Sequence, residues 1–128
     1  MNGISDTQLV SALRRQMTIA VAKQVASAGN LANVDTPEYK AVEVNFASAL
    51  DERLTPPAAT HSKHFSTASP GAISTQEIQG VTPRRDGNTV QLDQELLTMN
   101  RAGGDFSAAQ TALAAKFRLV RYAINEGR

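Results

Sequence analysis

Hydrophobic residues recur at alternating intervals of three and four positions near both ends of the chain, and the middle lacks this pattern. All 5 prolines lie in the middle, and proline breaks a helix interior because it has no N–H and clashes with the preceding turn. The pattern predicts a helix over about 5–33, a second over about 89–125, and an irregular segment over 37–88. We expect a mainly α fold in a single domain, residues 1–128, with its two long terminal helices packed as a coiled-coil-like pair.

The first predicted helix has recognisable ends and a weak apolar seam. Ser5 and Gln8 have the spacing of a capping box at its start, and Pro37 follows its end. The seam positions are Val10, Leu13, Met17, Ala20, Gln24, Ser27 and Leu31. Because several of them are small or polar, this helix buries little apolar area by itself and needs a surface to pack on.

The second predicted helix has a stronger seam, with mostly large apolar residues. Its positions are Leu92, Leu96, Met99, Gly103, Phe106, Gln110, Leu113, Phe117, Val120 and Ile124. Gly103 and Gly104 would ordinarily interrupt a helix, but the seam keeps its phase across them, which favours a bent continuous helix. We expect the two seams to pack together and further copies or related chains to cover the apolar surface that is left.

The middle segment is rich in Ser, Thr and Pro and shows few signs of regular structure. Residues 39–46 and 72–78 are the best candidates for extended chain, so we expect at most short β-strands. Asp86, Gly87 and Asn88 form a turn sequence, because Gly and Asn tolerate the positive φ that tight turns need.

Composition and charge exclude several classes of partner. Thirteen basic and 12 acidic residues leave a net charge of +1, too balanced for the long-range attraction that nucleic acids or anionic membranes require. There is no cysteine for a disulfide or a thiolate metal site, and no apolar run approaches the ~18 residues of a membrane-spanning helix. Only 4 Phe, 2 Tyr and no Trp are present, so an isolated subunit should be weakly stable and partners should supply further burial.

No arrangement of residues for catalysis or ligand binding stands out. His61 and His64 have a spacing that suits a metal, but the Ser/Thr-rich segment around them supplies no convincing further ligand. Arg84 and Arg85, beside the turn, favour solvated side chains over a phosphate contact. We therefore expect no enzyme activity, no metal, no cofactor and no small-molecule substrate.

The region that follows Arg14 and Arg15 superficially matches a secretory signal. Its apolar stretch, 17–22, is shorter than the roughly 7 to 15 residues of a signal core, and Lys23 interrupts it. We expect no cleaved signal peptide.

Residues 30–40 read NLANVDTPEYK, a string that resembles the signature of bacterial flagellar rod and hook proteins, where it also follows the first helix. The matching positions are Asn30, Leu31, Ala32, Asn33, Thr36, Pro37 and Tyr39. Glu38 stands where the family usually has Gly. Because Glu disfavours the positive φ of a type II turn, we expect a type I turn or an extended path here. Independently of the resemblance, this stretch has the residues that end a helix and form a turn.

A second string, DGNTV, opens the last helical region and resembles a motif of the proximal rod members of the same family. Its matching positions are Asp86, Gly87, Asn88 and Val90. The short chain, with helical ends around an irregular middle, also resembles these members in its whole layout.

The resemblance implies a structural subunit of the proximal rod of the bacterial flagellar basal body, polymerised through its terminal helices to transmit torque for motility. It implies export from the cytoplasm in the unfolded state by the flagellar type III apparatus, and a place in the rod, which crosses the periplasm. The implied partners are other rod subunits, copies of the chain itself, and export-gate and adaptor proteins at the rod base.

Two sets of residues would serve these roles. Phe46 and Leu50 look like the Phe-x-x-x-hydrophobic export-gate signal of early rod and hook substrates. Nine seam residues would form the inner helical layer of the assembly: Leu13, Met17, Leu31, Leu96, Phe106, Leu113, Phe117, Val120 and Ile124.

Two alternatives stay open. Another proximal rod subunit would share the first signature, and it is the DGNTV string and the short length that favour one subfamily. A soluble helical adaptor is the alternative from a different class. It would fold cooperatively by itself, whereas a rod subunit should have frayed ends.

Overall fold

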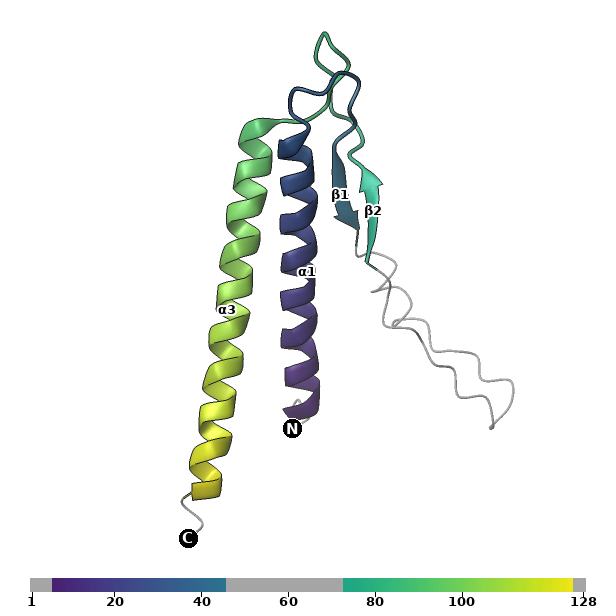
Figure 1. Ribbon diagram of the computed structural model, residues 1–128. Coiled ribbons are helices and arrows are strands. Elements are labelled where there is room, and N and C mark those ends of the chain that lie inside the picture. The colour runs from purple at the N-terminus through teal and green to yellow at the C-terminus, as the bar shows by residue number, and fades with distance from the viewer. Residues whose placement is uncertain (1–5, 46–72, 126–128) are drawn as a thin grey trace, which may run out of the picture.

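The computed structural model of the protein describes residues 6–45 and 73–125. Its elements, in chain order, are α1 (Asp6–Ala32), β1 (Val42–Asn45), β2 (Ser74–Glu77) and α3 (Leu92–Asn125). The prediction of a mainly α fold with two long terminal helices and only short strands is confirmed (Figure 1).

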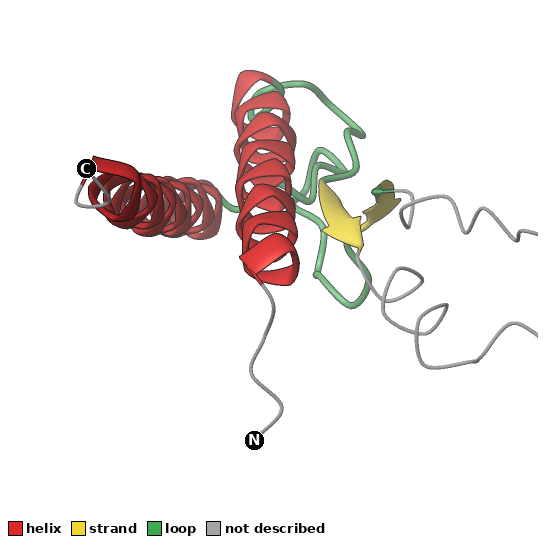
Figure 2. Ribbon diagram, turned by 90° about the horizontal axis from the view of Figure 1, so that it is seen from below, coloured by secondary structure: helices red, strands yellow, loops and turns green. Residues whose placement is uncertain are grey.

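The two helices lie side by side and run in opposite directions, so that the start of α1 and the end of α3 lie at the same end of the molecule (Figure 1). The strands form an antiparallel pair in which Val42 is opposite Glu77 and Asn45 is opposite Ser74. Viewed from below, α1 lies between α3 and the strand pair (Figure 2). The described loops between α1 and β1 and between β2 and α3 gather at the other end of the helix pair, which is called here the junction end (Figure 1).

The contact between the helices is made by small side chains. Ala20 and Ser27 of α1 and Ala102 and Ala109 of α3 are all buried. A Cβ added to Gly103 would lie 3.3 Å from Nε2 of Gln24, which is tighter than an ordinary contact. The glycine thus fits a close approach of the two helices, and α3 continues through it without a break. This is a thin core, because small side chains remove little apolar area from water.

The packed face of α3 differs in part from its predicted seam. Glu95, Ala102 and Ala109 are buried, and each precedes a predicted seam position by one residue, which is a rotation of about 100° around the helix axis. Phe106 and Leu113 belong to both faces and are half-buried. The reason is steric, because alanine and glycine allow a closer approach of the helix axes than leucine does.

The seam of α1 faces its partner more nearly as predicted. Leu13, Met17 and Leu31 are half-buried, in line with the buried Ala20 and Ser27. Six large side chains of the α3 seam stay exposed, with exposed fractions of 47% for Leu92, 42% for Leu96, 37% for Met99, 59% for Phe117, 41% for Val120 and 69% for Ile124. A single chain therefore leaves most of the large apolar side chains of the α3 seam exposed to solvent. Neither long helix contains, within the part that the structure describes, a stretch apolar enough to cross a bilayer.

Candidate functional site

The side chain of Asn30, in the last turn of α1, is fully buried and joins three parts of the fold. Its Nδ2 donates to the backbone oxygen of Val42 at 2.8 Å and to Oε1 of Glu95 on α3 at 2.8 Å. Its Oδ1 accepts from the backbone N–H of Val42 at 3.0 Å and from the hydroxyl of Tyr39 at 3.4 Å. The carboxamide thus bonds to β1 as a neighbouring strand would, and ties it to both helices.

Asn88, from the second motif, is also fully buried and binds the end of α1. Its Nδ2 lies 2.9, 3.2 and 2.8 Å from the backbone oxygens of Asn33, Val34 and Thr36. Its Oδ1 accepts from the N–H of Val90 at 2.7 Å. These three oxygens belong to the turn that follows Ala32, so Asn88 fixes this turn from a segment that is distant in the sequence.

Backbone hydrogen bonds join the two motifs along their length. The N–H of Glu38 donates to the oxygen of Asp86 at 2.9 Å, and the N–H of Thr89 donates to the oxygen of Tyr39 at 3.1 Å. Oγ1 of Thr89 accepts from the N–H of Ala41 at 2.8 Å. The two strings that were identified separately in the sequence therefore form one structural unit, which we call the motif junction.

The turn from Thr36 to Tyr39 corrects the expectation for Glu38. Glu38 has a φ of 62°, and the N–H of Tyr39 donates to the oxygen of Thr36 at 3.4 Å. Pro37 in the second place and a positive φ in the third fit a type II turn, so the prediction of a type I turn or an extended path was wrong. The hydrogen bond from the N–H of Glu38 to the opposite segment stabilises this conformation, and it offsets the cost of a left-handed residue.

Gly87 is the residue across from Glu38. Its φ is 80°, and a Cβ added to it would lie 3.3 Å from Cγ and 3.4 Å from Cα of Glu38. Nζ of Lys40 donates to the oxygen of Gly87 at 3.0 Å. Both the backbone angle and the close approach explain why glycine occupies this position.

Arg84 was expected to be solvated, and the structure shows a different arrangement. Although its side chain is exposed, Nη2 donates to the backbone oxygen of Val90 at 2.9 Å and Nη1 lies 3.4 Å from that of Val34. Its backbone N–H donates to the oxygen of Asn88 at 2.8 Å. The guanidinium thus closes the motif junction from outside, and no contact in the described part of the chain assigns a role to Arg85.

The other signature residues complete the end of α1. Nδ2 of Asn33 donates to the oxygen of Gly29 at 2.9 Å, and Oγ1 of Thr36 donates to Oδ1 of Asn33 at 3.2 Å. Leu31 is half-buried, whereas Ala32 and Pro37 are exposed.

Sequence reasoning missed two members of the motif junction. Glu95, 6% exposed, was not singled out in the second predicted helix, and Thr89 was not among the matching positions of the second motif. The position of Thr89 inside the second motif was the available signal, whereas nothing in the spacing of Glu95 distinguishes it from a solvent-facing residue.

The motif junction has the chemistry of a structural site. In the stretches 6–45 and 73–125, every buried polar side-chain atom has a hydrogen-bond partner. The same stretches contain no group of His, Cys, Asp and Glu able to hold a metal ion. Donors and acceptors are therefore matched within the chain. His61 and His64, and the proposed export signal at Phe46 and Leu50, lie outside the described residues.

Comparison with known proteins gives two informative matches, although no family model matches the chain. The chain is 41% identical over 71 residues to the flagellar basal body rod protein FlgB of Aeromonas hydrophila, a match that covers 52% of this chain and about half of that relative, 54%. It is 26% identical over 119 residues to FlgB of Bacillus subtilis, with 91% of this chain and 92% of that relative covered.

The pair of long terminal helices and the motif junction that ties them together define a helical structural unit. Both relatives bear the name of one rod protein, in agreement with the resemblance seen in the two motifs. The chain is thus similar to FlgB flagellar basal body rod proteins, by a partial match at 41% identity and a nearly full-length match at 26% identity.

Proposed function

We propose that this protein is a structural subunit of the flagellar basal-body rod, in its proximal part, and that it assembles through its terminal helices to transmit torque. The observation that supports this most is the match to a rod protein over 91% of the chain. The name of that relative describes a rod component, and the similarity extends across both helices and both motifs.

The unsatisfied seam of α3 supports assembly through the helices. Leu96, Phe117, Val120 and Ile124 are large, apolar and exposed. Burying one such side chain against a neighbour would contribute about 1.5 to 3 kcal/mol. Together with Leu13, Met17, Leu31, Phe106 and Leu113, which are half-buried, they form the proposed assembly seam.

The thin core supports export in the unfolded state through the flagellar type III apparatus. The buried hydrophobic residues of the described part are four alanines and one valine: Ala20, Ala41, Ala102, Ala109 and Val90. A domain with so little buried apolar area gains little free energy on folding alone, so unfolding it for export costs little. Neighbouring subunits that cover the helices after export would supply the apolar burial that the isolated domain lacks.

The proposed partners are other rod subunits, copies of this chain, and export-gate and adaptor proteins at the rod base. Contact with the export gate is assigned to Phe46 and Leu50 on sequence grounds alone. The rod subunit needs neither nucleic acid nor a small-molecule substrate for this role.

The test is retention of the tagged chain in purified flagellar basal bodies after washing with detergent and alkali. A rod subunit should resist both washes, together with the rest of the rod. A well-expressed chain that is absent from basal bodies, in a tagged strain that still swims, would contradict the proposal and favour a soluble helical adaptor. The tag belongs on whichever terminus leaves swimming intact.

A further inference from the structure

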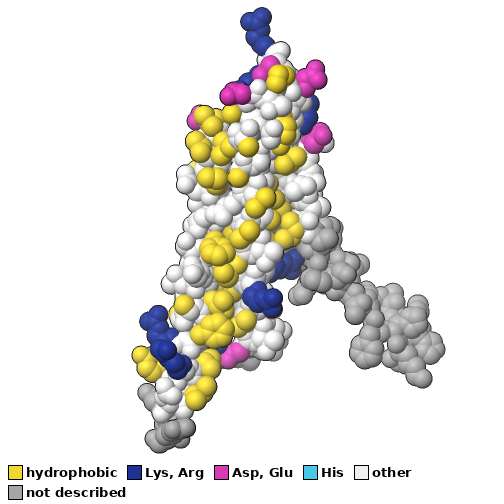
Figure 3. Space-filling model, in the orientation of Figure 1, with side chains coloured by type: hydrophobic (Ala, Val, Ile, Leu, Met, Phe, Trp, Pro, Cys, Tyr) yellow, Lys and Arg dark blue, Asp and Glu magenta, His cyan; other side chains and the backbone are white. Residues whose placement is uncertain are grey.

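Asp86 and Gly87, in the second motif, form a chemically reactive pair. Asp86 is the one Asp of the sequence that is followed by Gly. A backbone nitrogen can attack the side-chain carboxyl of the preceding Asp to form a cyclic imide, and glycine hinders this attack least because it has no Cβ. Acidic side chains gather on the surface at the junction end (Figure 3), and Asp86 is itself exposed, so water reaches its carboxyl group. The pair can therefore rearrange without an enzyme.

The rearrangement leaves the atoms of the chain unchanged in number. The nitrogen of Gly87 bonds to Cγ of Asp86, and its proton leaves with one carboxyl oxygen group as water. A water molecule then opens the ring at one of its two carbonyl carbons. Opening at Cγ restores Asp86. Opening at the backbone carbonyl carbon breaks the original peptide bond, so that the chain runs through Cβ and Cγ as an isoaspartate of the same mass.

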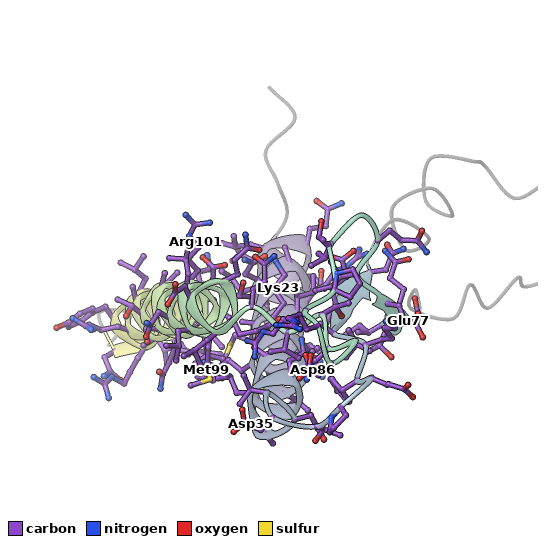
Figure 4. All side chains as sticks on the ribbon, turned by 90° about the horizontal axis from the view of Figure 1, so that it is seen from above. Lys23, Asp35, Glu77, Asp86, Met99 and Arg101 are labelled. Carbon is purple, nitrogen blue, oxygen red and sulfur yellow. The ribbon has the colours of Figure 1, made fainter. Side chains whose placement is uncertain are left out.

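The motif junction holds both reacting groups in place. The N–H of Gly87 donates to the backbone oxygen of Arg84 at 2.9 Å, and Oδ1 of Asp86 accepts from the N–H of Asn88 at 3.1 Å. Figure 4 looks onto this end of the molecule and shows Asp86 beside the end of α1. The attack requires the nitrogen to give up its proton and the carboxyl to turn toward it. Both hydrogen bonds oppose these changes in the folded chain.

An isoaspartate at position 86 does not fit the motif junction. It lengthens the backbone by one C–C bond, about 1.5 Å. The backbone oxygen of Asp86 accepts from the N–H of Glu38 at 2.9 Å, and the oxygen of Gly87 accepts from Nζ of Lys40 at 3.0 Å. The two segments are also close, because a Cβ added to Gly87 would lie 3.3 Å from Cγ of Glu38. A shift of one bond length therefore displaces both hydrogen bonds.

We propose that Asp86 is a site of spontaneous backbone isomerisation, and that closure of the motif junction protects it. The unfolded chain reacts, and the isoaspartate product does not rebuild the motif junction. This chemistry is separate from the rod function. Only its consequence in the cell rests on the proposed export in the unfolded state, because a subunit that waits unfolded accumulates the isomer until it folds.

The test is incubation of the purified full-length protein near neutral pH in heavy-oxygen water, with and without enough urea to unfold it. Each ring opening builds one heavy oxygen atom into residue 86. Tryptic digestion in ordinary water gives the peptide 86–101, apart from Asn2, which is also followed by Gly, and fragmentation locates the label. The label should accumulate roughly tenfold faster in urea. Equal rates would overturn the protection, and no label in urea would overturn the site.

Three variants separate the reactive pair from its protection. Asp86→Glu would need a larger ring, so the label at residue 86 should disappear even in urea. Asn88→Ala keeps the reactive pair but removes the side chain that binds the turn after α1, so its labelling without urea should approach the rate in urea. Thr111→Ala is the matched control at an exposed position of α3, and it should leave both rates unchanged. An Asn88→Ala chain that reacts no faster than the unchanged chain would contradict protection by the motif junction.

Separation of the isomer measures its effect on folding. Chains aged in urea are divided by chromatography into Asp86 and isoaspartate forms, which are then refolded and unfolded again by a urea titration. The isoaspartate form should have a folding equilibrium constant lower by about tenfold or more. An isomer as stable as the unchanged chain would overturn the claim that it does not rebuild the motif junction. These measurements do not depend on retention in basal bodies, so the proposed rod function and this proposal can fail separately.

Discussion

The two ends of the helix pair differ in how completely a single chain buries its side chains and pairs their polar atoms. At the junction end, Asn30 and Asn88 are fully buried, and their polar atoms have partners within the same chain. Near the end of α3, Phe117 and Ile124 are more than half exposed. At the junction end, a single chain supplies the hydrogen-bond partners of its buried side chains. At the opposite end, a single chain leaves apolar surface uncovered.

The difference separates folding from assembly. Directional hydrogen bonds to named atoms allow one geometry only, so the motif junction sets how the two helices and the strand pair are joined. Apolar contact is non-directional and depends on area, so the exposed apolar side chains near the end of α3 can pack against surfaces of different shape. Substitutions at the junction end should therefore change the free energy of unfolding, and substitutions near the end of α3 should change motility.

The largest expected effect is on motility and comes from a substitution near the end of α3. Phe117→Asp should abolish swimming, because it places a charge where a neighbouring subunit would bury an apolar ring. The free energy of unfolding of the isolated chain should change by less than about 0.5 kcal/mol, since the site is exposed. A motility assay and urea unfolding measure the two quantities.

Thr111→Asp is a matched control, an exposed position of α3 that lies outside the predicted seam. It should preserve swimming. Swimming by the Phe117→Asp strain as well would exclude Phe117 from the assembly seam.

The largest expected effect on stability comes from Asn88. Asn88→Ala removes the side chain that donates to the turn after α1 and accepts from the N–H of Val90, and should lower the free energy of unfolding by about 3 kcal/mol. Thermal and urea unfolding followed by circular dichroism would show it. A loss below about 0.5 kcal/mol, the range of ordinary surface substitutions, would mean that water replaces the side chain without cost.

A second prediction for the motif junction concerns the bond between Asn30 and Glu95. Asn30→Ala should cost about 2 kcal/mol, because it leaves Glu95 and both polar backbone groups of Val42 without a partner. Glu95→Gln is the informative comparison. Its amide oxygen can still accept from Asn30, so it should cost less than about 1 kcal/mol. Equal losses from both variants would show that the charge of Glu95 matters more than its hydrogen bond.

Gly87→Ala should have a smaller effect, of about 1 to 2 kcal/mol. The added Cβ meets Glu38 at 3.3 Å, and alanine is disfavoured at a φ of 80°. Gly80→Ala provides the control, since Gly80 has a similar φ of 79° but nothing within 4 Å of the added Cβ. The difference between their unfolding free energies measures the contact with Glu38 alone.

The smallest expected effect is a gain. Glu38→Gly should raise the free energy of unfolding by roughly 0.5 kcal/mol, because glycine relieves the left-handed strain but adds entropy to the unfolded chain. A loss of stability in a urea titration would mean that the side chain of Glu38 contributes contacts worth more than the strain.

Much of the fold was predictable from local patterns. Proline placement and hydrophobic spacing identified the two terminal helices, because helix formation depends mostly on residues within a few turns of each other. The strands Val42–Asn45 and Ser74–Glu77 lie inside the two segments chosen as extended. The two motifs were recognisable as strings, and the turn at Gly87 followed from its residue types.

Other features depend on contacts between distant residues. No local rule pairs Asn88 with the carbonyls at the end of α1, 52 to 55 positions earlier in the chain, or Asn30 with Glu95, 65 positions later. The positive φ of Glu38 went against its local preference because the opposite segment holds its N–H.

The side of α3 that faces α1 was likewise outside the reach of periodicity. The spacing of large apolar residues identified a helix and its richest face, since that pattern is local. Which face meets α1 was settled by close approach at Ala102, Gly103 and Ala109, where small side chains on both helices fit together. The largest side chains were thereby left on the outside, because shape complementarity between two helices is a property of the pair and not of either one alone.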